Sequence, residues 1–264
     1  MPIAPAIYLS LSGKDVLITG GSEGIGASTV EHFALQGCQV IFLDIARVSA
    51  QDTINRVISL AKETSYQAYT IQTPVFYFCD VSNLRELQAT ASQIFKEYGT
   101  VHILVNNAAL TGHQARLSTE EVTSEAWDFN INTSLRHVFF LTQAACGGSI
   151  VNLGSITWRI PATGLPIYGA CKAAVMGLTR VQIKEVGPFN IRVNSVMPGA
   201  IATERQREEV LTPEYRAEVM QAQSLKRDLV PADAAKVIVF LASDEASGVT
   251  GSSYVVDGGW CSDP

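Results

Sequence analysis

The sequence predicts an α/β protein with one doubly wound sheet of about seven parallel strands and helices on both faces. Seven short apolar runs recur along the 264 residues and are separated by segments of helical length. Continuous apolar runs of this kind are typical of parallel strands that are buried on both faces. Each run ends in glycine or a small polar residue. Because ligands bind beyond the carboxyl ends of such strands, we expect the functional residues at these ends.

The expected strands follow one another with a helix after most of them. In chain order they are residues 15–19, 39–43, 75–79, 101–105, 149–153, 191–196 and 253–256. Helical spacing over residues 25–36 follows the first strand, and right-handed crossovers should place such helices on both faces of the sheet. No repeat or shift in composition marks a second domain, so residues 1–264 are expected to form a single domain.

Composition and charge exclude several classes of protein. A hydrophobic content of 47% with only 17% charged residues predicts a large core rather than disorder. The net charge of −6 and the lack of a basic run argue against binding to nucleic acid. No apolar run reaches the roughly 18 residues of a membrane span, and the first residues lack the pattern of a signal peptide. We therefore expect a cytoplasmic protein with no membrane or nucleic-acid partner.

The cysteines and histidines show no metal-binding pattern. The five cysteines are scattered, without a CxxC pair, which favours buried free thiols over zinc ligands or disulfides. They are Cys38, Cys79, Cys146, Cys171 and Cys261. The four histidines lack HxxxH or HExxH spacing, so no metal site is expected.

A glycine-rich turn, TGGSEGIG at residues 19–26, follows the first strand and opens the first helix. Glycines let a backbone approach a pyrophosphate, and a helix N-terminus offers it unpaired N–H groups. Taken alone, the turn could also close an ordinary strand–helix unit. Asp44 ends the second strand about 20 residues later, where a carboxylate would bind the ribose hydroxyls of an adenine dinucleotide.

The same two segments favour NAD over NADP. Asp44 and Glu23 supply two negative charges with no adjacent arginine, and together they would repel a 2′-phosphate. NADP remains the alternative if the side chain of Arg47 folds back toward Asp44.

Three residues point to proton transfer at a hydroxyl group. Ser155 follows the fifth strand, and Tyr168 and Lys172 are four residues apart, so on a helix they share one face. We expect the ammonium of Lys172 to lower the phenol pKa of Tyr168 toward working pH. Tyr168 would then act as the acid/base while Ser155 holds the substrate oxygen.

These motifs together resemble the short-chain dehydrogenase/reductase family over nearly the whole chain. The matching strings include NNAA (106–109), PGAIAT (198–203) and YVVDGG (254–259). The resemblance implies a Rossmann fold, an NAD(P) cofactor, and hydride transfer between the nicotinamide and a secondary alcohol, ketone or cyclic sugar hydroxyl. It implies cofactor contacts at Gly20, Ser22, Glu23, Gly24, Ile25, Gly26, Asp44, Asp80, Val81, Asn107, Ala108, Pro198, Gly199, Ile201 and Thr203.

Further strings resemble the bacterial sugar 1-dehydrogenases of this family, which oxidise aldoses to lactones. They are SLRHVFFLTQAA (134–145), GSITW (154–158), TERQ (203–206) and LKRDLVPAD (225–233). Candidate substrate contacts are Trp158, Arg159, His113 and Gln206, although each side chain could equally pack in the core or lie on the surface. Residues 204–230 are expected to form a helical lid over the substrate.

Two other functions stay open. A ketone reductase or alcohol dehydrogenase of an apolar secondary metabolite would carry a more apolar lid, and the mixed composition of this lid does not decide. A non-catalytic dinucleotide-binding subunit is the alternative of another class.

Three departures from the family pattern stand out. The family has a fourth catalytic residue, an asparagine that steadies a water in a proton relay, and gapless counting places Ser134 there; Asn132 could serve only if the helix shifts. The connection from residue 143 to 149 is unusually short and shortens a helix that commonly contacts another subunit in the family. This departure argues against the usual tetramer, and a homo-oligomer is expected as a dimer or a tetramer. The segment 61–74 is longer than usual and should form a surface excursion.

Overall fold

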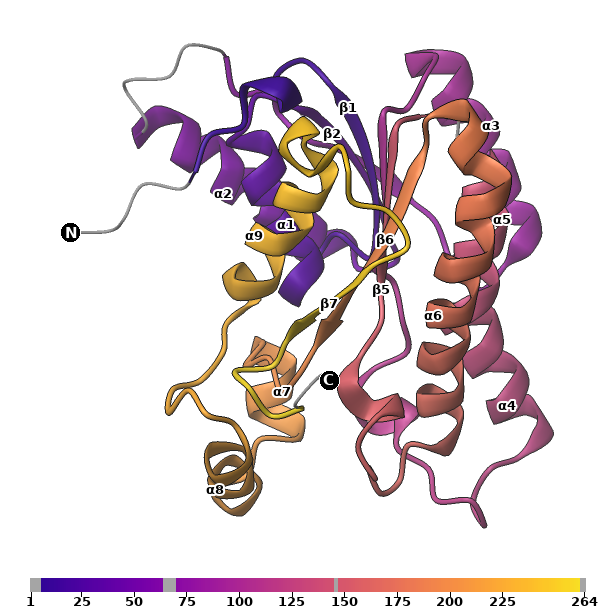
Figure 1. The fold of residues 1–264 in the computed structure, drawn as a ribbon, viewed down its shortest axis with the longest axis vertical. Coiled ribbons are helices and arrows are strands. Elements are labelled where there is room, and N and C mark those ends of the chain that lie inside the picture. The colour runs from indigo at the N-terminus through magenta and orange to yellow at the C-terminus, as the bar shows by residue number, and fades with distance from the viewer. Residues whose placement is uncertain (1–5, 64–69, 145–146, 262–264) are drawn as a thin grey trace.

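A parallel sheet of seven strands forms the centre of the molecule (Figure 1). The computed structural model describes residues 6–63, 70–144 and 147–261. The strand order is β3-β2-β1-β4-β5-β6-β7, and every neighbouring pair is parallel. The strands are β1 (Asp15–Thr19), β2 (Gln39–Asp44), β3 (Val75–Phe78), β4 (Ile103–Asn106), β5 (Ser149–Leu153), β6 (Arg192–Pro198) and β7 (Ser253–Val256). The predicted fold class is confirmed.

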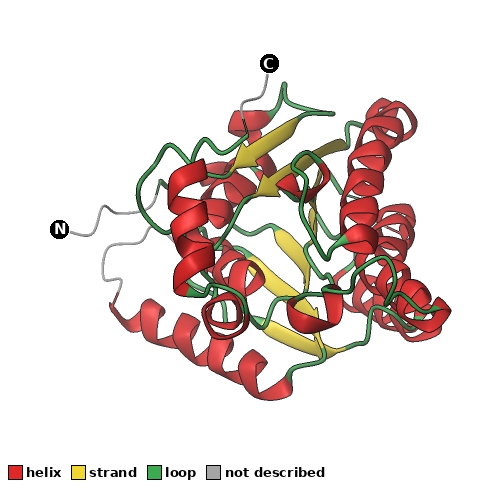
Figure 2. Cartoon of the chain, turned by 90° about the horizontal axis from the view of Figure 1, so that it is seen from below, coloured by secondary structure: helices red, strands yellow, loops and turns green. Residues whose placement is uncertain are grey.

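Helices cover both faces of this sheet (Figure 2). They are α1 (Gly24–Ala34), α2 (Arg47–Glu63), α3 (Leu84–Tyr98), α4 (Ser124–Ile131), α5 (His137–Ala144), α6 (Pro166–Val186), α7 (Glu204–Glu209), α8 (Pro213–Ala222) and α9 (Pro231–Ala242). Helices α1, α2 and α9 lie on one face, and α3, α4, α5 and α6 lie on the other (Figure 1). The helices α7 and α8 lie beyond one end of the sheet, at the bottom of Figure 1.

The alternation of buried side chains along β1 explains the two layers. Val16 and Ile18 belong to the core that includes Phe33 of α1, whereas Leu17 belongs to the core that includes Leu87 of α3. Successive side chains of a strand point to opposite faces, so a strand covered on both faces needs apolar residues at every position. This is why the strands were visible in the sequence as continuous apolar runs.

The expected boundaries were accurate to one or two residues. The strand expected at residues 101–105 begins at Ile103 and extends to Asn106, and the one expected at 75–79 ends at Phe78. Such differences are usual at the ends of elements, where the ladder frays. Within the segment 61–74, α2 continues to Glu63, while residues 64–69 lie outside the described residues, as do residues 145 and 146 of the short connection.

The topology of the sheet places the candidate site at the carboxyl ends of its central strands. Strands β1 and β4 are neighbours, and the chain leaves them in opposite directions across the sheet. The loops after β1 and β4 therefore separate at their carboxyl ends, which is where doubly wound sheets bind ligands.

The cysteines lie mainly in the core. Cys38, Cys79 and Cys171 are free and buried, as expected, whereas Cys261 is half-buried. Cys146 lies outside the described residues. Within the described part of the chain, no helix is both long and apolar enough to cross a bilayer.

Candidate active site

The turns after β1 and β4, the two neighbouring strands that the chain leaves in opposite directions, are held together by hydrogen bonds. The Nδ2 group of Asn107 donates to the carbonyl oxygens of Thr19 at 3.0 Å and Gly20 at 2.8 Å. The Oγ1 atom of Thr19 accepts from the backbone N–H groups of Asn107 and Ala108, both at 3.0 Å. Asn107 therefore shapes the glycine turn through its side chain, a bracing contact that the sequence did not reveal.

The glycines of this turn allow close approach between backbones. A Cβ atom on Gly26 would lie 1.8 Å from the carbonyl oxygen of Gly20, which no side chain can tolerate. Gly20 and Gly24 have positive φ values of 68° and 54°, a region that favours glycine. The turn therefore leaves its backbone open at the start of α1, as binding of a diphosphate requires.

Asp44 lies beside the glycine turn and fits the predicted ribose site. Its Oδ2 atom accepts from the N–H of Ser22 at 3.0 Å, and its Oδ1 atom accepts from Ile45 and Ala46 at 2.7 and 3.0 Å. A carboxylate has about four acceptor sites, so Oδ2 keeps one for a ligand hydroxyl. The Oγ atom of Ser22 is buried and lacks a hydrogen-bond partner among the described residues. These donors and acceptors fit an adenosine ribose.

The expected charge pattern around the turn is wrong in one respect. Glu23 is paired with Arg205, whose guanidinium lies 2.5 Å from the Glu23 carboxylate. Arg205 is 182 residues away in the chain, so no local pattern could indicate an arginine at this place. The guanidinium carbon of Arg47 lies 4.0 Å from the centre of the Phe78 ring, and Phe78 is the partner of Asp44 on the neighbouring strand.

Ser155, Tyr168 and Lys172 converge from the end of β5 and the first turns of α6. The Ser155 hydroxyl is hydrogen-bonded to Tyr168 and also accepts from the Thr157 hydroxyl at 3.0 Å. The ammonium of Lys172 lies 5.4 Å from the centre of the Tyr168 ring and donates to the Leu153 carbonyl at 2.7 Å. The structure thus brings together the three residues expected to carry the chemistry.

The expected direction of the tyrosine shift is wrong. Burial raises the pKa of Tyr168 to about 12, while its hydrogen bond to Ser155 and the charge of Arg116 act in the opposite direction. Burial also lowers the pKa of Lys172 to about 8. The cost of removing the phenolate from water therefore outweighs the hydrogen bond to Ser155 and the charge of Arg116. Arg116 lies in the loop after β4, and no sequence motif indicated that its charge acts on Tyr168.

The helix that carries Ser134 is interrupted by a π-helical turn, η3 (Asn132–Arg136), between α4 and α5. Ser134 is fully buried, and its hydroxyl accepts from the backbone N–H of Leu110 at 3.0 Å. Asn132 occupies the first position of the π turn. The hydroxyl of Ser134 therefore holds the loop after β4, and spacing within a regular helix could not reveal this.

The Asp80–Val81 segment is held in place by its neighbours. The carboxylate of Asp80 accepts from the N–H of Ser82 at 2.9 Å, and Val81 is buried. Arg136 of the π turn donates to the carbonyl of Ser82. The segment that is predicted to contact adenine is therefore anchored to the helices on this face of the sheet.

The loop after β6 leads from the sheet to α7. Pro198 ends β6, and a Cβ atom on Gly199 would lie 2.7 Å from the Cβ atom of Asp257. Ile201 is buried, and Thr203 caps α7 by accepting from the N–H of Gln206 at 3.1 Å. Ile25, in the first turn of α1, packs against the core that includes Phe33.

The four candidate substrate residues have different surroundings. Trp158 is 40% exposed, and its indole N–H lies 3.3 Å from the sulfur of Met197. The guanidinium carbon of Arg159 lies 5.7 Å from the Trp158 ring. His113 is exposed, and Gln206 of α7 is half-buried. Trp158 is therefore not a core residue, and Arg159 lies next to it.

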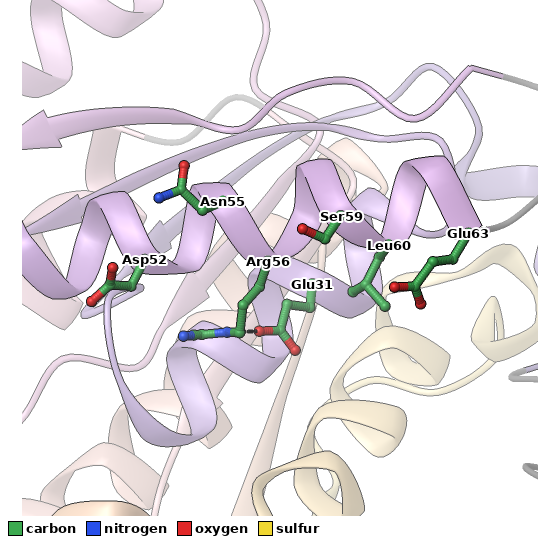
Figure 3. Close-up of a pocket in the computed structure, with 7 residues that line it drawn as sticks. All are labelled: Glu31, Asp52, Asn55, Arg56, Ser59, Leu60 and Glu63. Atoms are coloured by element: carbon green, nitrogen blue, oxygen red, sulfur yellow. Dashed lines mark hydrogen bonds and ion pairs between the residues drawn. The ribbon is translucent and has the colours of Figure 1, made fainter.

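Two surface pockets lie apart from these residues. One of about 480 Å³ lies between α1 and α2, where Arg56 donates to Glu31 at 2.6 Å (Figure 3). Another of about 510 Å³ includes Ile103, Ser149 and Arg192, the first residues of β4, β5 and β6. It therefore lies at the amino ends of the strands, opposite the carboxyl ends that carry the candidate site. No residue expected to bind cofactor or substrate lines either pocket.

Comparison with known proteins shows which family the chain belongs to. The family model described as enoyl-(acyl carrier protein) reductase matches residues 20–261. D-xylose 1-dehydrogenase of Caulobacter vibrioides is 42% identical, over 98% of this chain and all of its own length. A probable galactose dehydrogenase of Rhizobium meliloti is 41% identical over 98% of this chain and 99% of its own.

A solved structure has the same fold. The short-chain dehydrogenase/reductase of Serratia marcescens superposes with a TM-score of 0.84 at 29% identity and covers 96% of this chain and all of its own. The chain therefore belongs to the short-chain dehydrogenase/reductase family, and it is an oxidoreductase that acts on CH–OH groups with a nicotinamide cofactor.

Proposed function

We propose that the protein is an NAD-dependent aldose 1-dehydrogenase that oxidises the anomeric hydroxyl of a cyclic sugar to a lactone. The convergence of Ser155, Tyr168 and Lys172 at the carboxyl edge of the sheet carries the proposal. The two sugar dehydrogenases, each more than 40% identical to this chain over nearly its whole length, support the substrate class.

The cofactor would lie along the carboxyl edge, from Asp44 to Thr203. The glycine turn, with Gly20, Ser22, Gly24, Ile25 and Gly26, would hold the diphosphate, and Asp80 with Val81 would contact the adenine. Asn107 and Ala108, then Pro198, Gly199, Ile201 and Thr203, would border the nicotinamide. When bound, the oxidised nicotinamide supplies a hydride acceptor and a positive charge.

Tyr168 is the proton acceptor of the reaction. The substrate hydroxyl gives its proton to the Tyr168 phenolate, while the hydrogen on the same carbon leaves as a hydride; the reverse reaction returns both. Ser155, which is hydrogen-bonded to Tyr168, would orient the substrate oxygen. Because burial raises the pKa of Tyr168 to about 12, positive charge is needed to favour the phenolate, and Lys172 and Arg116 are the nearby cations. Ser134 would support this route by holding the loop after β4.

Asp44 and Arg47 support NAD as the cofactor, rather than NADP. The free acceptor site of Asp44 suits a ribose hydroxyl and disfavours a 2′-phosphate. Arg47 lies over the ring of Phe78 and forms no ion pair with Asp44 among the described residues. Glu23 no longer contributes to this argument, because Arg205 offsets its charge.

Trp158 offers the most specific support for a sugar. Its ring is partly exposed three residues after Ser155, and aromatic faces suit sugar rings. Arg159, His113 and Gln206 would supply hydrogen bonds to sugar hydroxyls, with residues 204–230 as the lid of a single domain that spans residues 1–264. An apolar alcohol or ketone is the second candidate.

The protein is also proposed to act in the cytoplasm as a homo-oligomer, either a dimer or a tetramer. Trp127, Phe139 and Val181 are 44–61% exposed on α4, α5 and α6, which share one face of the molecule. A contiguous exposed apolar patch is typical of an interface between subunits, so these three side chains are candidates for such a contact.

A spectrophotometric screen tests the proposed function. The purified protein is mixed with NAD or NADP and with aldoses, secondary alcohols and ketones, and the absorbance of reduced nicotinamide is followed. We expect turnover with NAD and a pentose or hexose, at a kcat/KM well above that for apolar alcohols. Turnover only with apolar substrates would contradict the sugar proposal, and preference for NADP would contradict the cofactor proposal.

The variant Tyr168→Phe is the matched control for catalysis. It removes the proton acceptor and keeps the ring, so it should lose turnover by a factor of about 10² to 10⁴ while binding NADH as before. Substantial remaining turnover would contradict the role of Tyr168. A wild-type protein that binds NADH yet turns over no substrate in the screen would favour the non-catalytic alternative.

A further inference from the structure

The short helix α7 is attached to the cofactor side of the molecule by a pair of contacts from one side chain. Arg205 donates to the Glu23 carboxylate in the glycine turn at 2.5 Å and to the Thr111 hydroxyl in the loop after β4 at 2.8 Å. Glu23 also accepts from the hydroxyl of Ser49 at 2.8 Å, which orients its carboxylate. We call the contacts among Glu23, Arg205 and Thr111 the clasp.

Contacts at both ends of α7 reinforce the clasp. At the first end, a Cβ atom on Gly24 would lie 3.0 Å from the methyl group of Thr203, so the helix starts directly against the glycine turn. At the other end, the Glu209 carboxylate accepts from the N–H of His113 at 3.2 Å. Four contacts therefore join α7 and its capping residue to the turn after β1 and to the loop after β4.

These two attachment points lie on either side of the place where a dinucleotide must pass. A cofactor bound to the glycine turn and reaching Tyr168 would cross the carboxyl ends of β1, β4 and β5, and so the interval between Glu23 after β1 and Thr111 after β4. With the clasp formed, α7 spans the same interval.

We propose that the clasp controls the exchange of the nicotinamide dinucleotide, with Arg205 and Glu23 as positioning residues that hold α7 closed. The inference rests on the binding of a dinucleotide and is independent of which alcohol or sugar is the substrate. Both side chains of the ion pair are nearly half exposed, at 45% and 44%. Exposed ion pairs are weak and screened by salt, so such a clasp opens readily and responds to ionic strength.

The rate of NADH dissociation tests this inference. NADH fluorescence is followed by stopped flow after displacement with excess NAD, for the wild type, Arg205→Gln, Glu23→Gln and the double variant. We expect each single variant to release NADH roughly two to five times faster than the wild type. The double variant should be no faster than either single variant, because all three lack the same ion pair.

Two controls separate the clasp from a general effect of charge or folding. Arg207→Gln removes the same charge from an exposed position on the same helix and should leave the rate unchanged. Arg205→Lys keeps the charge and should recover most of the wild-type rate. Raising salt from about 0.05 M to 0.5 M should accelerate release from the wild type but not from Arg205→Gln.

The outcomes that would overturn the inference are specific. A wild-type rate in both Arg205→Gln and Glu23→Gln would show that the clasp does not limit exchange. Faster release on removing Arg205 from the Glu23→Gln background would mean that Arg205 contacts the dinucleotide itself. Thermal unfolding at the wild-type temperature confirms that a variant is folded, and Thr111→Ala provides an independent way to weaken the clasp.

Discussion

At the scale of single residues, His137 shows how burial near the site ties stability to pH. Its imidazole is fully buried at the start of α5, 3.4 Å from the Thr19 hydroxyl that holds the turn after β4. Burial, followed by the charge of Lys172, lowers the pKa of His137 to about 3 from its ordinary 6.5. Between these pH values the unfolded chain binds a proton that the folded protein does not. The folded state is therefore stabilised above pH 6.5 and loses that advantage as the pH falls toward 3.

The variant His137→Asn should make stability less sensitive to acid. Between pH 7 and pH 5 the wild type should lose about 2 kcal/mol more of its unfolding free energy than the variant, since each pH unit below the unfolded pKa costs about 1.4 kcal/mol. Urea denaturation at both pH values measures the difference. His113→Asn, at an exposed position, is the control and should behave as the wild type. An equal loss in His137→Asn and the wild type would show that another group accounts for the acid sensitivity.

At the scale of elements, the contact between β1, its turn and α1 depends on the absence of a side chain. The hydrogen bonds of Asn107 hold the carbonyl of Gly20 close to α1, and the space for a Cβ atom at Gly26 is already filled. In α6, by contrast, a Cβ atom on Gly177 would meet nothing within 4 Å. A side chain therefore has no room at Gly26 but has free space at Gly177.

Gly26→Ala and Gly177→Ala form a matched pair that tests this difference. Gly26→Ala should destabilise the fold by about 1–3 kcal/mol, because the glycine turn must move away from α1, and should weaken the binding of NADH. Gly177→Ala should leave NADH binding unchanged and stabilise the protein by up to about 1 kcal/mol through helix propensity. Urea denaturation and NADH fluorescence titration measure both effects. Equal stability of the two variants would contradict the close packing at Gly26.

At the scale of the whole molecule, the two helical layers present different surfaces. Val181 on α6 is 61% exposed and lies on the face that also carries the exposed rings of Trp127 and Phe139. On the other face, Val48 of α2 is 78% exposed. If the proposed oligomer uses the face of α4, α5 and α6, a charge there should matter more than a charge on α2.

Light scattering coupled to size-exclusion chromatography tests this interface. The wild type should have a mass of two or four chains of 28.4 kDa. Val181→Glu should shift the protein toward a single chain, while the control Val48→Glu should keep the mass of the wild type. A wild-type protein of one chain mass would contradict the oligomer, and an unchanged mass in both Val181→Glu and Trp127→Glu would place the interface elsewhere.

The sequence by itself determined the sheet, the glycine turn and the trio of Ser155, Tyr168 and Lys172. These features depend on local spacing: buried strands need continuous apolar runs, and residues four apart on a helix share a face. The Asp44 position could also be read locally, because it follows directly from the end of β2.

Only the tertiary structure decided how these residues are charged, braced and covered. Arg205 reaches Glu23 across 182 residues, and Ser134 reaches Leu110 through a π turn that regular spacing does not predict. The raised pKa of Tyr168 reverses the expected direction, because burial of the phenol outweighs the charge of its neighbours. Contacts between distant segments and the loss of water around a group are properties of the folded chain, so no local pattern in the sequence can report them.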